Sequence, residues 1–451
     1  MPGANRPHSW ERRCTIFSGP AKSNRPLGRP DIAAPPGATP RPFTATTGAW
    51  CEAGLGICVL LLPPLLVLVP HGVAPLVGFA GLCAAGLVAA SPPYRFAALR
   101  LPAAILAALL VWGAASAMWS LAPGRSLVLD ARLAGLFAAG LALAAAASRV
   151  IAPRRFVTLL IAGIAIGLLL TGYDLVSEGG LSGLVSVRVF RMFRLNQIAV
   201  GLAILLLPVT ALLIERGRVV AALIAAAAMA TTVLSLEDAA AKTALLASLP
   251  IAALLYRWRA SVARLMAVLS VIAILTAPLT LPPLAQAPEL LAAADALKGS
   301  AGHRLLIWSF VGDRIAERPI AGWGLDAARA IPGGKDEVRP GLSRLPLHPH
   351  NAALQLWLEL GVPGAALFAL FVGWLWLRLT SVSWPRIYVA AAGGSLTAAL
   401  AAAFAAYGVW QEWWLGTLGL ALFLILVMAR VAEPAAGVTP PRRSGSRAAD
   451  R

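Results

Sequence analysis

Residues 347–364, with the sequence LHPHNAALQLWLELGVPG, join a short polar segment to a long apolar run. Two of the five histidines of the chain, His348 and His350, lie here on either side of a proline. Pro349 disfavours the α conformation at His348, and Asn351 is a good N-cap for the helix that follows. We therefore expect His350 beside a helix N-terminus, whose partial positive charge and unpaired N–H groups attract anions.

A stripe of polar side chains runs along the first turns of this predicted helix. Asn351, Gln355 and Glu359 follow one another at steps of four residues, so they share one helical face. Such polarity is unusual at the start of a membrane span. We expect this face to contact protein or a water-filled cavity and not lipid.

The composition indicates a polytopic membrane protein. Of 451 residues, 59% are hydrophobic and 13% are charged, and the mean hydropathy is +0.77. A net charge of +18 would suggest nucleic-acid binding in a soluble protein. Here the basic residues concentrate in the termini and short loops, where arginine sets topology and meets anionic membrane lipids. Because no nucleic-acid-binding motif is present, we expect lipids and not nucleic acid as partners.

Apolar runs long enough to span a bilayer predict an all-α protein of about twelve transmembrane helices. The runs lie near residues 53–69, 73–90, 101–119, 127–147, 155–172, 196–214, 219–236, 243–256, 262–282, 352–377, 386–407 and 413–430.

The same pattern divides the chain into five parts. These are a basic disordered cytoplasmic tail, nine helices, a long external segment with amphipathic helices, three further helices and a second basic cytoplasmic tail, at residues 1–50, 51–282, 283–350, 351–430 and 431–451. A start codon assigned too early accounts equally well for the first tail.

The arginine distribution predicts the orientation. With the N-terminus in the cytoplasm, most arginine-containing short loops are cytoplasmic, and so is the C-terminus. Two external segments also carry arginines: Arg188, Arg191 and Arg194 in 173–195, and Arg304, Arg314, Arg318, Arg329, Arg339 and Arg344 in 283–350. An anionic substrate is a sufficient reason for basic residues on that side.

The segment 283–350 is the one long non-membrane region between predicted spans, and loops of this length are usually functional. Apolar residues at near-helical spacing predict a helix from His303 to Glu317, and Pro319 ends it. The glycine-containing sequences that follow are typical of turns.

The stretch around His350 resembles a family signature. His350-Asn351, nine residues and then Gly361-x-x-Gly364 are similar to the signature of the O-antigen ligase and polymerase superfamily of membrane glycosyltransferases. Three other segments resemble that family in order and spacing, so that the resemblance covers roughly residues 100–430. They are WSLAP at 119–123, RMFRLNQIAVGLAILLLP at 191–208 and GHRLLIWSFVGDRIAERPIAGWGLD at 302–326.

The resemblance implies a GT-C-like fold in the bacterial inner membrane with an active site facing the periplasm. It implies transfer of a glycan from an undecaprenyl-diphosphate carrier, either to lipid A-core by a ligase or to another carried glycan by a polymerase. It also implies no cofactor and no metal, because the ligase branch is metal-independent and no Asp-x-Asp pair occurs here.

The resemblance assigns roles to the polar residues of the motif. Neutral imidazole suits a general base, so His350 is expected either to remove a proton from the acceptor hydroxyl or only to position the acceptor. The alternative is a residue that caps a helix at the membrane interface. His348, Asn351, Gln355 and Glu359 are expected to support this site.

Arginines are expected to bind the diphosphate, because the guanidinium fork matches phosphate oxygens. The resemblance assigns this role to Arg304 and to Arg191 or Arg194, against the alternative of snorkelling at the interface. Lys242 stands where relatives often have arginine, so its role stays open between substrate binding and a salt bridge.

Two other classes of protein remain open. A polysaccharide or lipid transporter with an ion path would need acidic residues deep in its helices, where this sequence has almost none. A structural membrane scaffold would tolerate loss of both His350 and the external arginines.

Overall fold

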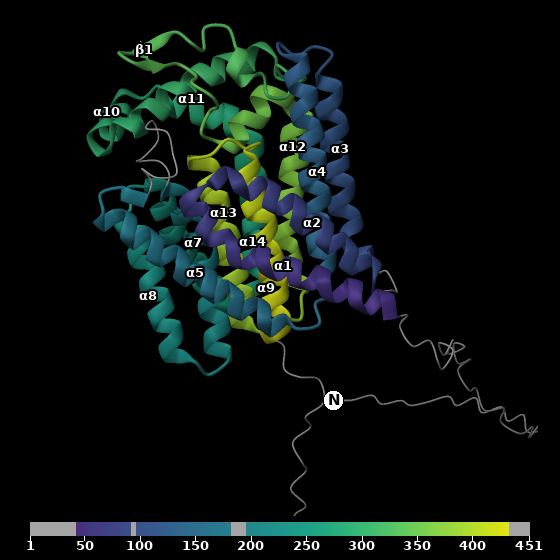
Figure 1. Cartoon of the computed structure of the whole chain (residues 1–451). Coiled ribbons are helices and arrows are strands. Elements are labelled where there is room, and N and C mark those ends of the chain that lie inside the picture. The colour runs from purple at the N-terminus through teal and green to yellow at the C-terminus, as the bar shows by residue number, and fades with distance from the viewer. Residues whose placement is uncertain (1–41, 92–95, 182–194, 433–451) are drawn as a thin grey trace, which may run out of the picture. The chain divides into compact units, whose positions relative to one another are not determined.

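The computed structural model describes residues 42–91, 96–181 and 195–432 (Figure 1). In these ranges the fold is all-α apart from one short hairpin, which confirms the predicted fold class. The helices are α1 (Pro42–Leu68), α2 (Val73–Ala89), α3 (Arg100–Ser116), α4 (Pro123–Ala146), α5 (Pro153–Val176), α7 (Leu195–Glu215), α8 (Val219–Ser235), α9 (Ala239–Ala285), α10 (Pro288–Leu297), α11 (Gly299–Glu317), α12 (Ala352–Ser381), α13 (Arg386–Ala405) and α14 (Glu412–Ala432). Short 3₁₀ helices are η1 (Pro70–Gly72), η2 (Ala97–Leu99) and η4 (Ala327–Ala330), and the strands are β1 (Glu337–Arg339) and β2 (Leu342–Ser343).

Each of the twelve predicted apolar runs lies on a helix, to within a few residues at its ends. Among the described residues, 10 helices are long and apolar enough to cross a membrane. The long helix α9 contains two of the predicted runs, and α8 is an apolar helix of 17 residues.

The helix α9 has 47 residues. At 1.5 Å per residue it is about 70 Å long, more than twice the ~30 Å hydrocarbon thickness of a bilayer. Its backbone leaves the helical region at Trp258, where φ is −133° and ψ is 52°. Next to this break, Arg259 Nε donates to the carbonyl oxygen of Leu379 at 2.6 Å, near the end of α12. The two predicted runs are therefore joined by a bend and not by a separate loop.

The helix α12 breaks at Gly361, where φ is +62°. A Cβ atom at this position would lie 2.1 Å from the carbonyl oxygen of Ile320, so no other residue fits. The segment that contacts this break is just as tightly packed: a Cβ on Gly322 would lie 2.4 Å from the carbonyl oxygen of Glu359. The half of α12 before the break, residues 352–360, is almost completely buried.

The helices α10 and α11 and the hairpin β1–β2 lie together at one end of the long helices (Figure 1). The helix predicted to end before Pro319 is α11, which ends at Glu317. The hairpin was not predicted, because strands of three and two residues are too short to show a period. It is tied to α10 by Arg339, whose guanidinium nitrogens donate to both carboxylate oxygens of Asp295 at 2.8 and 2.7 Å.

The predicted end of the first tail, at residue 50, is wrong. The helix α1 begins at Pro42, so residues 42–50 are helical. Proline is favoured in the first turn of a helix, and residues 43–50 contain no charged side chain to interrupt the apolar run. Residues 1–41 and 433–451 lie outside the described residues.

The helix packing brings four distant parts of the chain to one place. The helix α9 packs against α11, α12 and α13, and α13 packs against α7 as well. The start of α9, the start of α12 and the loop after α13 therefore lie near α11. The predicted site residues that the structure describes lie on these parts of the chain.

Candidate functional site

The predicted site lies where the segment before α12 meets α11 and the loop between α13 and α14. We call residues 406–411 the α13–α14 loop. The indole Nε1 of Trp308, on α11, donates to the carbonyl oxygen of Pro349 at 3.0 Å. His350 Nδ1 lies 2.6 Å from the carbonyl oxygen of Ala406, at the start of the α13–α14 loop. Two residues that are 41 and 56 positions away along the chain thus hold the histidine segment through hydrogen bonds.

Asn351 is the N-cap of α12, as predicted. Its Oδ1 accepts a hydrogen bond from the N–H of Leu354 at 3.1 Å. Its Nδ2 donates to the carbonyl oxygen of Phe404, near the end of α13, at 3.0 Å. The side chain therefore starts one helix and joins it to another.

The hydrogen bond of His350 to Ala406 determines the tautomer of the imidazole. A carbonyl oxygen can only accept, so Nδ1 must carry the proton and donate it. In the neutral ring, Nε2 then has a free lone pair. No described residue donates a hydrogen bond to His350 Nε2. The backbone of His350 has φ = +55°, an uncommon conformation for a residue with a side chain.

His348 supports the conformation of this segment. Its Nδ1 accepts from the backbone N–H of His350 at 3.2 Å, and the two ring centroids are 4.3 Å apart. Because Nδ1 accepts, the proton of the neutral ring is on Nε2. The side-chain nitrogen of Gln411 lies 3.4 Å from Nε2 and is also a donor, so the two form no hydrogen bond in this orientation of the amide. His348 is 7% exposed, which fits a supporting role better than direct contact with a substrate.

Both histidines are held in the neutral form. Burial lowers the pKa of His350 to about 4; the hydrogen bond to Ala406 opposes this, and the positive charge of Arg304 adds to it. Burial lowers the pKa of His348 to about 3, and the neighbouring His350 lowers it further. At pH 7 both rings are therefore neutral, and a neutral imidazole is the form that accepts a proton.

Arg304, on α11, lies beside Asp238 at the start of α9. Burial lowers the pKa of the Arg304 guanidinium, and the carboxyl group of Asp238 partly offsets this. Asp238 caps α9, because its Oδ1 accepts from the N–H of Ala240 at 3.0 Å. Its Oδ2 lies 3.3 Å from the hydroxyl of Tyr407. Burial raises the pKa of Tyr407 well above its usual value, so the hydroxyl keeps its proton.

A cavity of about 310 Å³ opens beside Arg304. Its lining residues are Glu237, Ala239, Lys242, Leu297, Lys298, Ser300, Ala301 and Arg304. The ammonium group of Lys298 donates to the carbonyl oxygen of Glu237 at 3.0 Å. The side chains of Lys242 and Arg304 form no hydrogen bond or ion pair with any described residue. Three cations around one cavity suit an anionic ligand, and Lys242 has no salt bridge there.

Arg191 and Arg194 lie outside the described residues. The helix α7 begins directly after them, at Leu195. The backbone carbonyl oxygen of Asn196, in its first turn, accepts from the hydroxyl of Tyr407 at 3.2 Å. The first turn of α7 is therefore part of the same group of contacts as Asp238.

Gln355 and Glu359 face protein, as the polar stripe predicted, and the structure identifies the α13–α14 loop as one of their partners. Gln355 Oε1 accepts from the backbone N–H of Val409 at 2.9 Å, and its Nε2 donates to Glu359 Oε1 at 3.2 Å. Glu359 Oε2 accepts from Trp410 Nε1 at 2.6 Å and from the N–H of Asp326 at 2.8 Å. Glu359 is completely buried. Both side chains hold other parts of the protein and leave no group facing a ligand.

Two of the other segments that resemble the family meet at the break in α12. The N–H groups of Trp323 and Gly324 donate to the carbonyl oxygens of Leu358 and Glu359 at 2.9 and 2.8 Å. Trp119 Nε1, from the WSLAP segment, donates to the carbonyl oxygen of Ala321 at 3.3 Å. These contacts stabilise the fold around residues 352–360.

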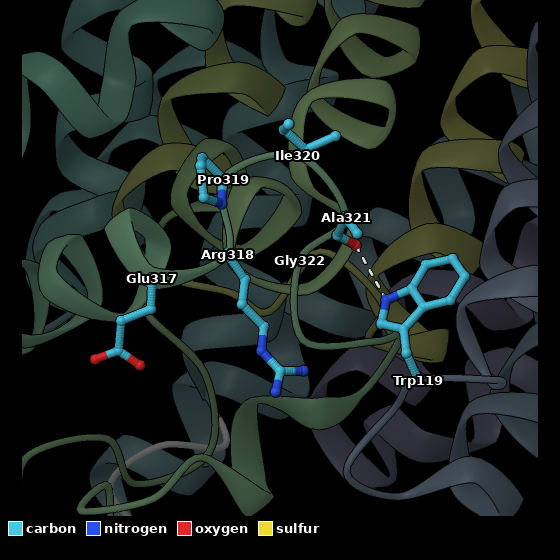
Figure 2. A pocket seen from close by; sticks show the side chains of 7 residues that line it. All are labelled: Trp119, Glu317, Arg318, Pro319, Ile320, Ala321 and Gly322. Atoms are coloured by element: carbon cyan, nitrogen blue, oxygen red, sulfur yellow. Dashed lines mark hydrogen bonds between the residues drawn. The ribbon is translucent and has the colours of Figure 1, made fainter.

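Figure 2 shows a second cavity, of about 380 Å³, between Trp119 and residues 317–322. The guanidinium carbon of Arg318 lies 4.1 Å from the ring centroid of Trp323. None of the predicted site residues lines this cavity. It is therefore distinct from the cavity beside Arg304.

Sequence reasoning missed the α13–α14 loop. Residues Ala406, Tyr407, Val409, Trp410 and Gln411 of this loop each contact a different residue of the site. The sequence did mark this loop, because polar and aromatic residues at 407–414 lie where one apolar run ends and the next begins. Their partners could not be deduced from it.

Fold and site together define a class of protein: a polytopic helical membrane protein with a neutral histidine and a cationic cavity at one end of its helices. Comparison with known proteins supports a family. The domain described as O-antigen ligase matches residues 220–369, which include Arg304, His350 and the first half of α12.

Three relatives bear the name "putative polysaccharide ligase". They come from Rickettsia conorii, Rickettsia typhi and Rickettsia prowazekii and are 33%, 32% and 32% identical to this chain over 143 residues. The match covers 31% of this chain and 34% of each relative, so it spans about a third of their length. These matches confirm the resemblance to the O-antigen ligase superfamily.

Proposed function

We propose that this protein is a glycosyltransferase of the O-antigen ligase type. It transfers a glycan from undecaprenyl diphosphate to a lipid A-core acceptor at the periplasmic face of the bacterial inner membrane. The observation that carries the proposal is the state of His350. Its Nδ1 donates its proton to the carbonyl oxygen of Ala406, which leaves Nε2 without a donor among the described residues, and the charge of Arg304, which lines the cationic cavity, acts on the ring.

His350 acts as the general base. Nε2 takes the proton of an acceptor hydroxyl while the oxygen of that hydroxyl forms a bond to the anomeric carbon of the glycan. The bond between that carbon and the diphosphate oxygen breaks, and the electron pair leaves with the carrier diphosphate. The imidazolium then releases its proton to water.

The cavity beside Arg304 holds the diphosphate. Guanidinium and ammonium groups form strong hydrogen bonds to phosphate oxygens and stabilise the charge that develops on the leaving group. Among the described residues, Arg304 and Lys242 form no salt bridge, and Asp238 acts on Arg304 only from a longer distance, so both cations can bind a ligand. Arg191 or Arg194 completes the clamp in this proposal.

The bound diphosphate also strengthens the base. In the free protein, burial lowers the pKa of His350 to about 4, which makes the ring a weak base. An anion placed close to the ring stabilises the imidazolium and raises its pKa. Proton transfer is then favoured only when the donor is bound.

The periplasmic location rests on the arginine distribution. The basic side chains of 283–350 are unusual for an external segment unless they bind an anion. Two of the three cations that line the cavity, Lys298 and Arg304, belong to this segment and fit that reason.

The test measures glycan transfer by purified protein in detergent, with a lipid-linked glycan as donor and lipid A-core as acceptor. His350→Ala is expected to lower turnover by about 10²–10⁴-fold, the usual range for a general base, and to leave donor binding intact. His71→Ala is the matched control, because His71 is exposed on η1 and outside the site. Normal transfer by a folded His350→Ala protein would reject the base.

A deletion strain distinguishes ligase from polymerase. Loss of a ligase is expected to leave uncapped lipid A-core with glycan accumulating on the carrier. Loss of a polymerase instead leaves glycans of a single repeat. An unaltered envelope glycan profile in a strain that normally expresses the gene would count against both.

A further inference from the structure

The α13–α14 loop contacts both halves of the proposed site. At its start, the carbonyl oxygen of Ala406 accepts from His350 Nδ1 at 2.6 Å. One residue later, the hydroxyl of Tyr407 lies 3.3 Å from Asp238 Oδ2, beside Arg304. The loop therefore joins the base to the cationic cavity through adjacent residues.

The covalent geometry couples these two contacts. The carbonyl group of Ala406 and the N–H of Tyr407 belong to one planar peptide group. A shift of Tyr407 therefore turns the Ala406 carbonyl, whose direction determines which nitrogen of His350 carries the proton.

The hydroxyl of Tyr407 is well placed to hold this peptide group. It contacts Asp238 Oδ2 and, at 3.2 Å, the carbonyl oxygen of Asn196. Its ring packs against Trp413 and Trp414, with centroid distances of 4.8 and 5.2 Å. The two ring contacts hold the aromatic ring in place, and the two hydroxyl contacts hold the oxygen end of the side chain.

The far end of the loop has separate anchors. The N–H of Val409 donates to Gln355, and the indole of Trp410 donates to Glu359. Loss of the Tyr407 hydroxyl would thus release the Ala406 end of the loop while the other end stays attached to α12.

We infer that Tyr407 is a positioning residue of the proposed transferase: its hydroxyl holds the Ala406 carbonyl in the direction that keeps His350 protonated on Nδ1. The inference rests on the proposed function, because it gives His350 the role of base. It adds a residue to the site that acts through His350 and touches neither substrate.

The test compares Tyr407→Phe with Tyr388→Phe in the purified full-length protein. Tyr388, in the first turn of α13, is a matched control outside the site: it is completely buried, and its hydroxyl donates to the carbonyl oxygen of Ile425 at 2.8 Å. Both substitutions remove one buried hydroxyl and keep the ring. Tyr407→Phe is expected to lower kcat about tenfold, as the loss of hydrogen bonds of ordinary strength does, with little change in the KM of the donor. Tyr388→Phe is expected to keep the kcat of the wild type.

A second measurement reads the tautomer directly. Protein labelled with ¹⁵N-histidine gives separate signals for protonated and unprotonated ring nitrogens, and the signals of His350 are those missing in His350→Ala. The wild type and Tyr388→Phe are expected to show a single tautomer with the proton on Nδ1. Tyr407→Phe is expected to show a mixture of the two tautomers.

Three results would overturn the inference. They are wild-type kcat in Tyr407→Phe, an equal loss of kcat in the Tyr388 control, and a single Nδ1 tautomer in a Tyr407→Phe protein of lowered kcat. Failure of the proposed function looks different, because His350→Ala itself would then transfer glycan normally.

Discussion

Arg304→Lys is the sharpest test of the cationic cavity, because it keeps the charge and removes the planar guanidinium fork. Lysine places one point charge where arginine can form two parallel hydrogen bonds to a phosphate. The substitution therefore costs about one charge-assisted hydrogen bond, roughly 1.5–3 kcal/mol. Arg304 is only partly buried, and solvent reduces such energies, so the lower end of this range applies. The expected effect is a Kd for the donor raised about tenfold.

The structure indicates that the fold will survive this change. The side chain of Arg304 forms no hydrogen bond or ion pair with the described residues, so none is lost. Asp238 keeps its hydrogen bond to the N–H of Ala240 at the start of α9. We expect the melting temperature of Arg304→Lys to equal that of the wild type.

The assay is a binding titration of detergent-solubilised protein with a short-chain polyprenyl diphosphate. Arg318→Lys is the control, because Arg318 lies in the second cavity and stacks on Trp323. It is expected to leave the Kd unchanged. Equal affinity of the wild type and Arg304→Lys, at equal melting temperatures, would refute the assignment of the diphosphate to this cavity.

The remaining predictions concern the base, the helix cap and the topology. As the pH falls through about 4, His350 gains a proton and kcat/KM should fall, because burial lowers its pKa to about that value; a loss of activity already centred near pH 6.5 would contradict this. Asn351→Ala should lower the free energy of unfolding by about 1–2 kcal/mol, while Asn351→Ser retains a capping oxygen; equal melting temperatures of the two variants would exclude the cap. Single cysteines in residues 285–345 should react with an impermeant maleimide added from the periplasmic side, whereas labelling only after the cytoplasm is opened would reverse the orientation.

The fold class could be predicted because it depends on local properties of the chain. Each membrane helix needs a run of apolar residues, and such a run is visible whatever it packs against. The cap at Asn351 and the end of α11 before Pro319 were also predicted correctly, since both depend on residues within one helical turn.

The break in α12 at Gly361 could be predicted from the sequence only in part. Gly361 was recognised as part of a motif, but the reason for a glycine there lies in residues 320–322, which approach its backbone from a separate segment. In the same way, the polar stripe at Gln355 and Glu359 was expected to face protein. Only the structure identified its partners as Val409, Trp410 and Asp326.

By itself, the sequence determined that this is a helical membrane protein and that His350 stands beside a helix N-terminus. The tertiary structure decided which nitrogen of His350 is free, through a carbonyl oxygen 56 residues away. It also brought Tyr407 to Asp238, across 169 residues. The physical reason is range: apolar length and capping act within one helix, whereas a hydrogen bond between distant residues exists only after the helices between them have packed.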